Sequence, residues 1–302
     1  MEIIARSDDY QITFHAAADT PSDTLVITFA GLPTGLESDG FGTDFCLAHG
    51  YDTIFTAQRI NTQYQGLSLE DFEAAVAPKA AEYKTVVCYG PSLGGYAALY
   101  FGGTINARII VAAPMLPAWP HLRNRKCADL KINHIPLYDV PKSEHIPVVV
   151  YDPMVVIDTN NVETMVEPAY PTITKVEVPF AGHPVLVSLA KAHILKPFIL
   201  HFFETGEVMD FERPGEGSAI WHRERARYFL RNEPEKARPE FEKSLAIEGS
   251  KLTFNLLIQC LIKVGDLEGA QEKLDFSRQS DERIHQMNIH IAKQATTAGL
   301  HV

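Results

Sequence analysis

The chain has 302 residues, of which 46% are hydrophobic and 22% charged, and these ordinary globular values exclude a disordered or fibrous protein. A net charge of −11 disfavours nucleic acid as a partner, because phosphate binding needs clustered Lys and Arg. Four widely separated cysteines without a Cys-x-x-Cys pair indicate neither a metal site nor a disulfide framework, and nothing indicates a cofactor. With no export segment and no apolar stretch of about 18 residues, we expect a cytoplasmic protein that does not cross a membrane.

The first two thirds of the chain alternate short β-branched runs with helical patterns, which is typical of a mostly parallel sheet covered by helices. The run at 25–29 is continuously apolar, as expected for a strand that is buried on both faces. The fold class predicted for this part is therefore α/β, with helices on both faces of the sheet. The expected strands lie at about 10–16, 25–29, 53–56, 84–89, 108–112, 146–151 and 174–178.

Three helices are expected between these strands. Ser68 followed by two acidic residues predicts a capped helix that begins directly after it. A second helix should run from Ser92 to Phe101, where Gly102 stops it. A third is expected to span about 184–204 without interruption.

The composition changes after Gly206, where strand patterns vanish and the segment 213–218 has the residues of a linker. We expect two domains, 1–210 and 218–302, the second made only of helices. Within it, 231–237 realigns with 264–270 at an offset of 33 residues. A period near 34 resembles the tetratricopeptide repeat over about 220–280, with a further helix at about 281–297. The resemblance implies a concave surface that binds a protein partner.

The strongest motif joins the strand expected at 84–89 to the helix that begins at Ser92. Gly90-Pro91-Ser92-Leu93-Gly94 has the pattern Gly-x-Ser-x-Gly, in which both glycines are needed because the tight turn leaves no room for a Cβ. The turn directs the first helical N–H groups, Leu93 N–H foremost, toward whatever the serine attacks. With this motif the chain resembles the α/β-hydrolase family over about 10–205.

The resemblance implies an order along the chain of nucleophile, acid and histidine. Ser92 is the candidate nucleophile, and His183 follows the last expected strand directly, where the family places its general base. Asp152 and Asp158 both follow the strand at 146–151, and the sequence leaves open which of them orients the histidine. The other would cap a helix near Asn160 or close a turn.

The family also implies a second oxyanion donor in the loop after an early strand. That loop is 30–35 here, and Leu32 is its candidate donor because Pro33 has no N–H. About thirty residues separate the strands at 108–112 and 146–151, where the family inserts a lid. They are too few for a full helical cap, so a small or polar acyl substrate is expected. Arg123, Arg125 and Lys126 could hold a carboxylate there or lie in solvent.

The sequence therefore predicts a serine hydrolase that cleaves an acyl ester, thioester or amide of a small molecule. Its acyl-enzyme would form on Ser92, with His183 as general base, and no metal would take part. Two alternatives remain. One is a catalytically silent scaffold whose helical repeats bind a protein partner, and the other is an acyltransferase that uses the same residues.

Overall fold

The computed structural model describes residues 1–18, 22–32, 35–37, 39–122 and 124–275. The chain divides into two compact units, Met1–Gly215 and Glu216–Val302. Three features named above lie outside the described residues: Pro33, Arg123 and the helix expected at 281–297.

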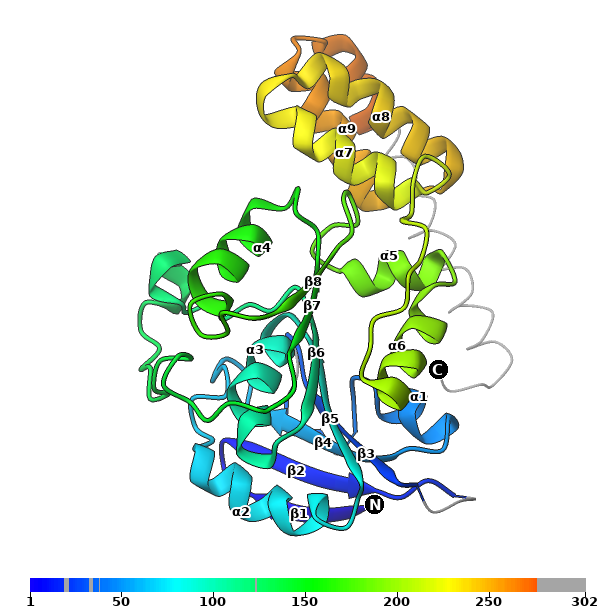
Figure 1. Ribbon diagram of the computed structural model, residues 1–302. Helices are drawn as coiled ribbons and strands as arrows, with labels where there is room; N and C mark the ends of the chain where they lie inside the picture. Colours follow the sequence, from blue (N-terminus) through cyan, green and yellow to red (C-terminus); the bar gives the residue numbers. More distant parts are fainter. Residues whose placement is uncertain (19–21, 33–34, 38, 123, 276–302) are drawn as a thin grey trace, which may run out of the picture. The chain divides into compact units, whose positions relative to one another are not determined.

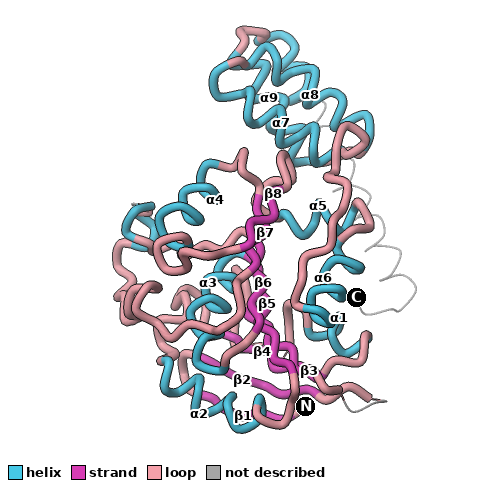
Figure 2. The backbone as a smooth tube through the Cα atoms, in the orientation of Figure 1, coloured by secondary structure: helices cyan, strands magenta, loops and turns pink. Residues whose placement is uncertain are grey.

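The first unit is built on one eight-stranded sheet with the strand order β1-β2-β4-β3-β5-β6-β7-β8 (Figures 1 and 2). The strands β3 to β8 pair in parallel, whereas β1 and β2 are antiparallel to their neighbours. The strands are β1 (Glu2–Arg6), β2 (Tyr10–His15), β3 (Thr24–Phe29), β4 (Asp52–Gln58), β5 (Thr85–Pro91), β6 (Arg108–Ala112), β7 (Val148–Tyr151) and β8 (Thr174–Glu177). The seven predicted strands are all present, and β1 was missed because this edge strand has no buried side chain.

Helices cover both faces of this sheet, which confirms the predicted fold class (Figures 1 and 2). One face carries α1 (Thr43–Ala48), α5 (Val185–Lys191) and α6 (Leu195–Thr205). The other carries α2 (Leu69–Ala80) and α3 (Ser92–Phe101), together with the turn that follows α4 (Val156–Asn161). Each face has its own apolar core, and the carboxyl ends of the parallel strands meet between these layers at one edge of the sheet.

Two of the three predicted helices form as expected. Ser68 caps α2 by accepting a hydrogen bond from Asp71 N–H at 3.0 Å, and α3 begins at Ser92 and ends before Gly102. The prediction of one helix over 184–204 was wrong. That stretch breaks into α5 and α6, which meet at 111°. At the break His193 has a left-handed φ of 59°, and Pro197, which lacks an N–H, falls in the first turn of α6.

The described part of the second unit holds α7 (Ala219–Asn232), α8 (Pro234–Ile247) and α9 (Lys251–Lys263), and a further helical stretch begins at residue 267. Ser218 and Ser250 start α7 and α9 in the same way, each accepting a backbone hydrogen bond from the residue three positions on. Ala226, Ala237 and Phe241 form part of its separate core. Helix hairpins are thus present, while the tetratricopeptide assignment stays a prediction.

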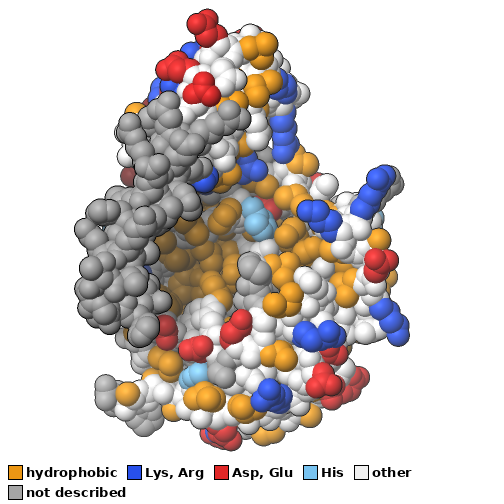
Figure 3. Space-filling view, turned by 180° about the vertical axis from the view of Figure 1, so that it is seen from behind, with side chains coloured by type: hydrophobic (Ala, Val, Ile, Leu, Met, Phe, Trp, Pro, Cys, Tyr) orange, Lys and Arg blue, Asp and Glu red, His pale blue; other side chains and the backbone are white. Residues whose placement is uncertain are grey.

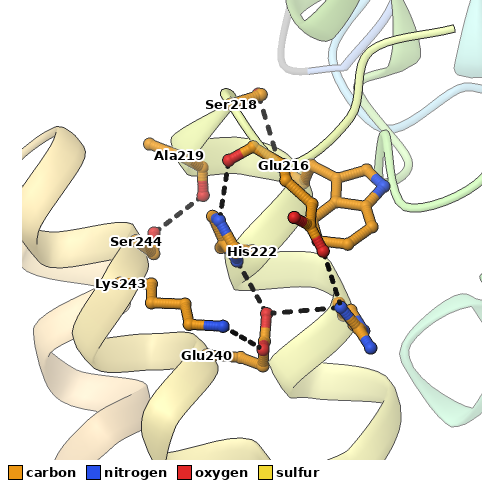
Figure 4. A network of polar contacts seen from close by, with 9 residues as sticks. Glu216, Ser218, Ala219, His222, Glu240, Lys243 and Ser244 are labelled. Carbon is orange, nitrogen blue, oxygen red and sulfur yellow. Dashed lines mark hydrogen bonds and ion pairs between the residues drawn. The ribbon is translucent and has the colours of Figure 1, made fainter.

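A polar network lies inside the helical unit (Figure 4). His222 on α7 is hydrogen-bonded through Nδ1 to a carboxylate oxygen of Glu240 on α8 at 2.6 Å, and through Nε2 to the Glu216 carbonyl at 2.8 Å. Lys243 adds a contact of 3.1 Å to the same carboxylate, and Arg225 lies 3.9 Å from it. Because His222 and Glu240 are both buried, this network joins α7 to α8 inside the unit.

Within the described residues, no single helix is long and apolar enough to cross a membrane, and α5 with α6 passes such a test only as a sharply bent pair.

The surface of the described residues carries charge of both signs. On the face seen in Figure 3, basic side chains are interspersed with acidic ones.

Candidate active site

The turn between β5 and α3 holds Ser92 in a strained conformation. Its φ angle is 50°, in the left-handed region that costs a non-glycine residue about 1–3 kcal/mol. A Cβ on Gly90 would lie 2.4 Å from the Gly94 carbonyl oxygen, and one on Gly94 would lie 2.3 Å from the Phe29 carbonyl oxygen. Both contacts are with backbone and cannot be relieved by a side chain. The two glycines are therefore what allows the turn to close against the end of β3.

Ser92 and His183 come together although 91 residues separate them. His183 lies in the loop between β8 and α5, and its Nε2 is 3.0 Å from Ser92 Oγ. Its Nδ1 is 2.6 Å from Asp158 Oδ1. The Asp158 side chain is fully buried, whereas that of His183 keeps 31% exposure. A connected chain of hydroxyl, imidazole and carboxylate results, at the carboxyl ends of the strands.

The partners of His183 determine its tautomer. An ionised carboxylate only accepts hydrogen bonds, so the proton is on Nδ1, and this N–H donates a hydrogen bond to Asp158. Nε2 then presents its lone pair to the Ser92 hydroxyl, which donates. This arrangement lets the imidazole remove a proton from Ser92 and lets the carboxylate stabilise the imidazolium that forms.

The two candidate acids occupy different places. Asp158 lies in the first turn of α4 and contacts the imidazole of His183. Asp152 directly follows β7, is also fully buried, and accepts backbone hydrogen bonds from Met154, Phe180 and Gly182. The bond from Met154 closes a turn after β7. Of the two candidates, Asp158 is the one that contacts the imidazole, and its role as the acid stays a prediction.

The candidate oxyanion donors come from two segments, the first turn of α3 and the loop after β3. Leu93 is the second residue of α3, so its N–H belongs to the first helical turn, whose positive end faces the Ser92 side. Gly31 lies against the turn, since a Cβ there would be 3.7 Å from the Pro91 carbonyl oxygen. Leu32 follows it with a side chain that is 44% exposed. The start of the loop after β3 thus lies against the turn at Pro91, and the donor role of Leu32 stays a prediction.

The connection between β6 and β7, residues 113–147, starts at the serine itself, because Met115 N–H donates to the Ser92 carbonyl at 3.0 Å. In its described residues it forms only two short 3-10 turns, Pro120–Leu122 and Arg125–Cys127, and no cap helix. Arg125 and Lys126 are both exposed in the second of these turns. Of the two roles considered for them, binding a carboxylate or lying in solvent, their exposed placement matches the second.

Buried glutamines fix this connection to the loop after β4. Gln63 Oε1 accepts a hydrogen bond from Ala118 N–H at 2.9 Å, and Gln65 Oε1 accepts from the N–H groups of Asn133 and His134 at 3.0 Å each. Gln63 has a φ of 49°, so its backbone is strained as well. These glutamines were missed, and only the run of amide and hydroxyl residues at 61–65, unusual beside a strand, could have indicated them.

His134 closes the contact between the same two segments. Its Nε2 is 3.0 Å from the Leu67 carbonyl, which can only accept, so Nε2 carries the proton. Nδ1 then accepts from the Tyr96 hydroxyl at 2.9 Å. The ring also stacks on Tyr100 with centroids 3.9 Å apart. Burial lowers the pKa of His134 from 6.5 to about 4, which matches the neutral ring that these bonds require.

The described residues offer no group of three or more His, Cys, Asp and Glu side chains that could hold a metal ion.

Comparison with known proteins gives structural neighbours but no sequence relatives. No protein-family model matches the chain, and no curated protein matches it significantly. MGS-MChE2, an α/β hydrolase from a sediment metagenome of the Mar Chica lagoon in Morocco, is 15% identical, with a TM-score of 0.42 over 67% of this chain and 99% of its own. Est1E from Butyrivibrio proteoclasticus is 15% identical, with a TM-score of 0.43 over 65% of this chain and 94% of its own. YeeB, a sugar hydrolase from Lactococcus lactis, is 14% identical, with a TM-score of 0.44 over 67% of this chain and 96% of its own.

Proposed function

We propose that the protein is a serine hydrolase that cleaves a small acyl ester, thioester or amide through an acyl-enzyme on Ser92. The observation that carries this proposal is the unbroken set of hydrogen bonds from Ser92 Oγ to His183 Nε2, at 3.0 Å, and from His183 Nδ1 to Asp158, at 2.6 Å. Nucleophile and base lie within hydrogen-bond reach, and a third group orients the base.

The reaction follows from these positions. His183 Nε2 takes the hydroxyl proton as Ser92 Oγ attacks the acyl carbon, and the new imidazolium is paired with Asp158. The negative charge that develops on the acyl oxygen is stabilised by Leu93 N–H and by a second N–H from the loop at Leu32. His183 then protonates the leaving group. Water deprotonated by the same imidazole attacks the acyl carbon, and Ser92 is released with its proton restored.

The strain at Ser92 supports an enzyme over a silent scaffold. A left-handed serine costs about 1–3 kcal/mol, and the turn also requires two glycines that no side chain could replace. A fold that served only to carry helical repeats would gain nothing from this arrangement. Strained residues of this kind cluster at sites where geometry serves chemistry.

Substitution of Ser92 by Ala tests the proposal. We expect hydrolysis of p-nitrophenyl esters and labelling by a fluorophosphonate both to be lost, because no other hydroxyl lies against His183 Nε2 among the described residues. Ser188→Ala is the matched control. Ser188 lies in α5, is more buried than Ser92, and its Oγ has no hydrogen-bond partner within the described residues. Full activity of Ser92→Ala would refute the proposal.

A panel of esters with graded acyl length would then define the substrate. The short connection between β6 and β7 leads us to expect the highest kcat/KM for small acyl groups. Addition of an alcohol acceptor separates hydrolysis from acyl transfer, since a transferase would form the new ester in preference to the free acid.

A further inference from the structure

The loop that carries His183 is held by the second aspartate. Asp152 Oδ1 accepts hydrogen bonds from Phe180 N–H at 3.1 Å and from Met154 N–H at 2.8 Å. Asp152 Oδ2 accepts from Gly182 N–H at 2.7 Å. Gly182 immediately precedes His183, so the last fixed backbone N–H before the imidazole points at this carboxylate.

The backbone of this loop has a positive φ at two residues, of which only Phe180 is strained by it. Phe180 has a φ of 59° and Gly182 one of 78°. Glycine adopts such values freely, but a residue with a bulky side chain does so only where its surroundings impose it. Backbone N–H groups two residues apart that converge on one anion form a nest. Here the anion is supplied by the chain itself, because the buried carboxylate of Asp152 lies in the concavity.

Resting on the proposed function, we propose that Asp152 is a positioning residue for His183. Its carboxylate holds the loop 178–183 in the conformation that places Nε2 against Ser92 Oγ. It acts through the backbone and leaves the imidazole to Asp158. The two buried aspartates thus have complementary roles. Asp158 orients the imidazole ring of His183, and Asp152 fixes the backbone that carries this side chain.

Replacement of the Asp152 carboxylate by an amide removes this support at almost no change in volume. If the new amide nitrogen faced Gly182, two N–H donors would oppose each other. If the amide were flipped, Phe180 and Met154 would lose their acceptor instead. In both orientations the loop is released from the strained φ at Phe180, and His183 moves relative to Ser92. Displacements of about 1 Å cost a catalytic step about 100-fold in rate.

The experiment compares Asp152→Asn with Asp158→Asn, the same change six residues further on at an equally buried position. Assays use p-nitrophenyl acetate across a range of pH. For Asp152→Asn we expect kcat per folded molecule to fall about 100-fold, with KM within roughly threefold of wild type. The midpoint of its pH profile and the low-field proton resonance of His183 Nδ1–H should be kept, because Asp158 still faces the ring. For Asp158→Asn we expect a loss of about 10⁴-fold, an altered pH profile and no such resonance.

Tyr170→Phe is the control for a general loss of stability. Its hydroxyl donates to the Leu99 carbonyl at 2.6 Å and is buried in the same unit, and its removal should leave kcat per folded molecule unchanged. Wild-type kcat in folded Asp152→Asn would overturn the inference while leaving the proposed function intact. Loss of the resonance in Asp152→Asn, with its retention in Asp158→Asn, would also overturn it by exchanging the two roles. If Ser92→Ala stays active, it is the proposed function that fails.

Discussion

Two regions of this protein contain the same kind of side-chain pair in the same geometry. In the first unit, Met1–Gly215, His183 Nδ1 lies 2.6 Å from Asp158, and in the helical unit His222 Nδ1 lies 2.6 Å from Glu240. What differs is the atom opposite Nε2. For His183 it is a hydroxyl, which can donate a proton, and for His222 it is the Glu216 carbonyl, which can only accept (Figure 4).

This one atom decides what each imidazole can do. Both nitrogens of His222 face acceptor groups, so no hydroxyl lies where this imidazole could take its proton. Nε2 of His183 faces the hydroxyl of Ser92. Exposure differs in the same sense, since the His222 side chain is 5% exposed and that of His183 31%. A histidine–carboxylate pair alone is therefore no evidence of catalysis.

The largest expected effect separates the two histidines by activity. His183→Gln should lower kcat by about 10⁴-fold or more, because the base that activates Ser92 is lost. His222→Gln should leave kcat per folded first unit unchanged, since this imidazole is hydrogen-bonded only to groups of the helical unit. Steady-state hydrolysis of p-nitrophenyl acetate measures both. Comparable losses in the two variants would show that the pairs are not functionally distinct.

Ser92 and His183 could be nominated from the sequence because their placement is local. Ser92 follows from the Gly-x-Ser-x-Gly motif after a strand, and His183 from its position directly after the last strand. The choice between Asp152 and Asp158 could not be made, because it depends on how the loop at 178–183 folds back onto β7. The sequence contains both carboxylates but no sign of which one the backbone of that loop will bind.

A second effect concerns the backbone that supports each region. Gly94→Ala places a Cβ 2.3 Å from the Phe29 carbonyl oxygen, a contact between main-chain segments that only a shift of α3 against β3 can relieve. We expect a loss of about 2–3 kcal/mol in the free energy of unfolding, together with lower activity. Gly249→Ala, in the helical unit, meets nothing within 4 Å and should be neutral within about 0.5 kcal/mol. Urea unfolding measures both, and equal stabilities would contradict the tight turn at Ser92.

A third effect tests the structural role of the helical pair. His222→Gln removes the partner of a buried carboxylate, although Lys243 and Arg225 still compensate its charge in part. We expect the helical unit to lose about 1–3 kcal/mol of stability, followed by circular dichroism during urea unfolding. Lys251→Ala, an exposed position at the start of α9, is the control. An unchanged unfolding midpoint in His222→Gln would mean that the network adds nothing to the hairpin.

The same network predicts a dependence on pH. Burial acts to raise the pKa of Glu240, but hydrogen bonds from His222 and Lys243 and the charge of Arg225 outweigh it and hold the pKa below the ordinary 4.5. The stabilisation is therefore complete above pH 4.5 and is lost as the pH falls below it. Glu240→Gln should remove this part of the acid sensitivity. A helical transition equally acid-sensitive in the variant would assign it to other carboxylates.

The long-range polar contacts could not be predicted from the sequence, because they too depend on how distant segments fold against each other. His134 and Gln65 lie 69 positions apart, and neither belongs to a periodic pattern that would indicate burial. Their contact arises only when the connection between β6 and β7 folds across the loop after β4. The helical network is the same kind of case, since Glu240 looks like any acidic residue on a charged helix until α8 packs against α7.

His134 provides the smallest effect and a third arrangement of partners for the comparison. It is held neutral, with Nε2 donating to Leu67 and Nδ1 accepting from Tyr96, and burial lowers its pKa from 6.5 to about 4. Between these values the unfolded chain binds a proton that the folded protein does not, so stability falls as the pH drops through this window. From about pH 6.5 to about pH 5 we expect His134 to account for about 1 kcal/mol of that loss.

His134→Gln isolates this contribution, because an amide can donate to Leu67 and accept from Tyr96 without titrating. Its free energy of unfolding should vary less with pH between about 6.5 and 5 than that of wild type. His145→Gln, an exposed histidine of the same connection, should keep the wild-type slope. If the two variants have equal slopes, His134 is protonated in the folded protein, and its ring cannot be the neutral donor and acceptor that joins the connection to the loop after β4.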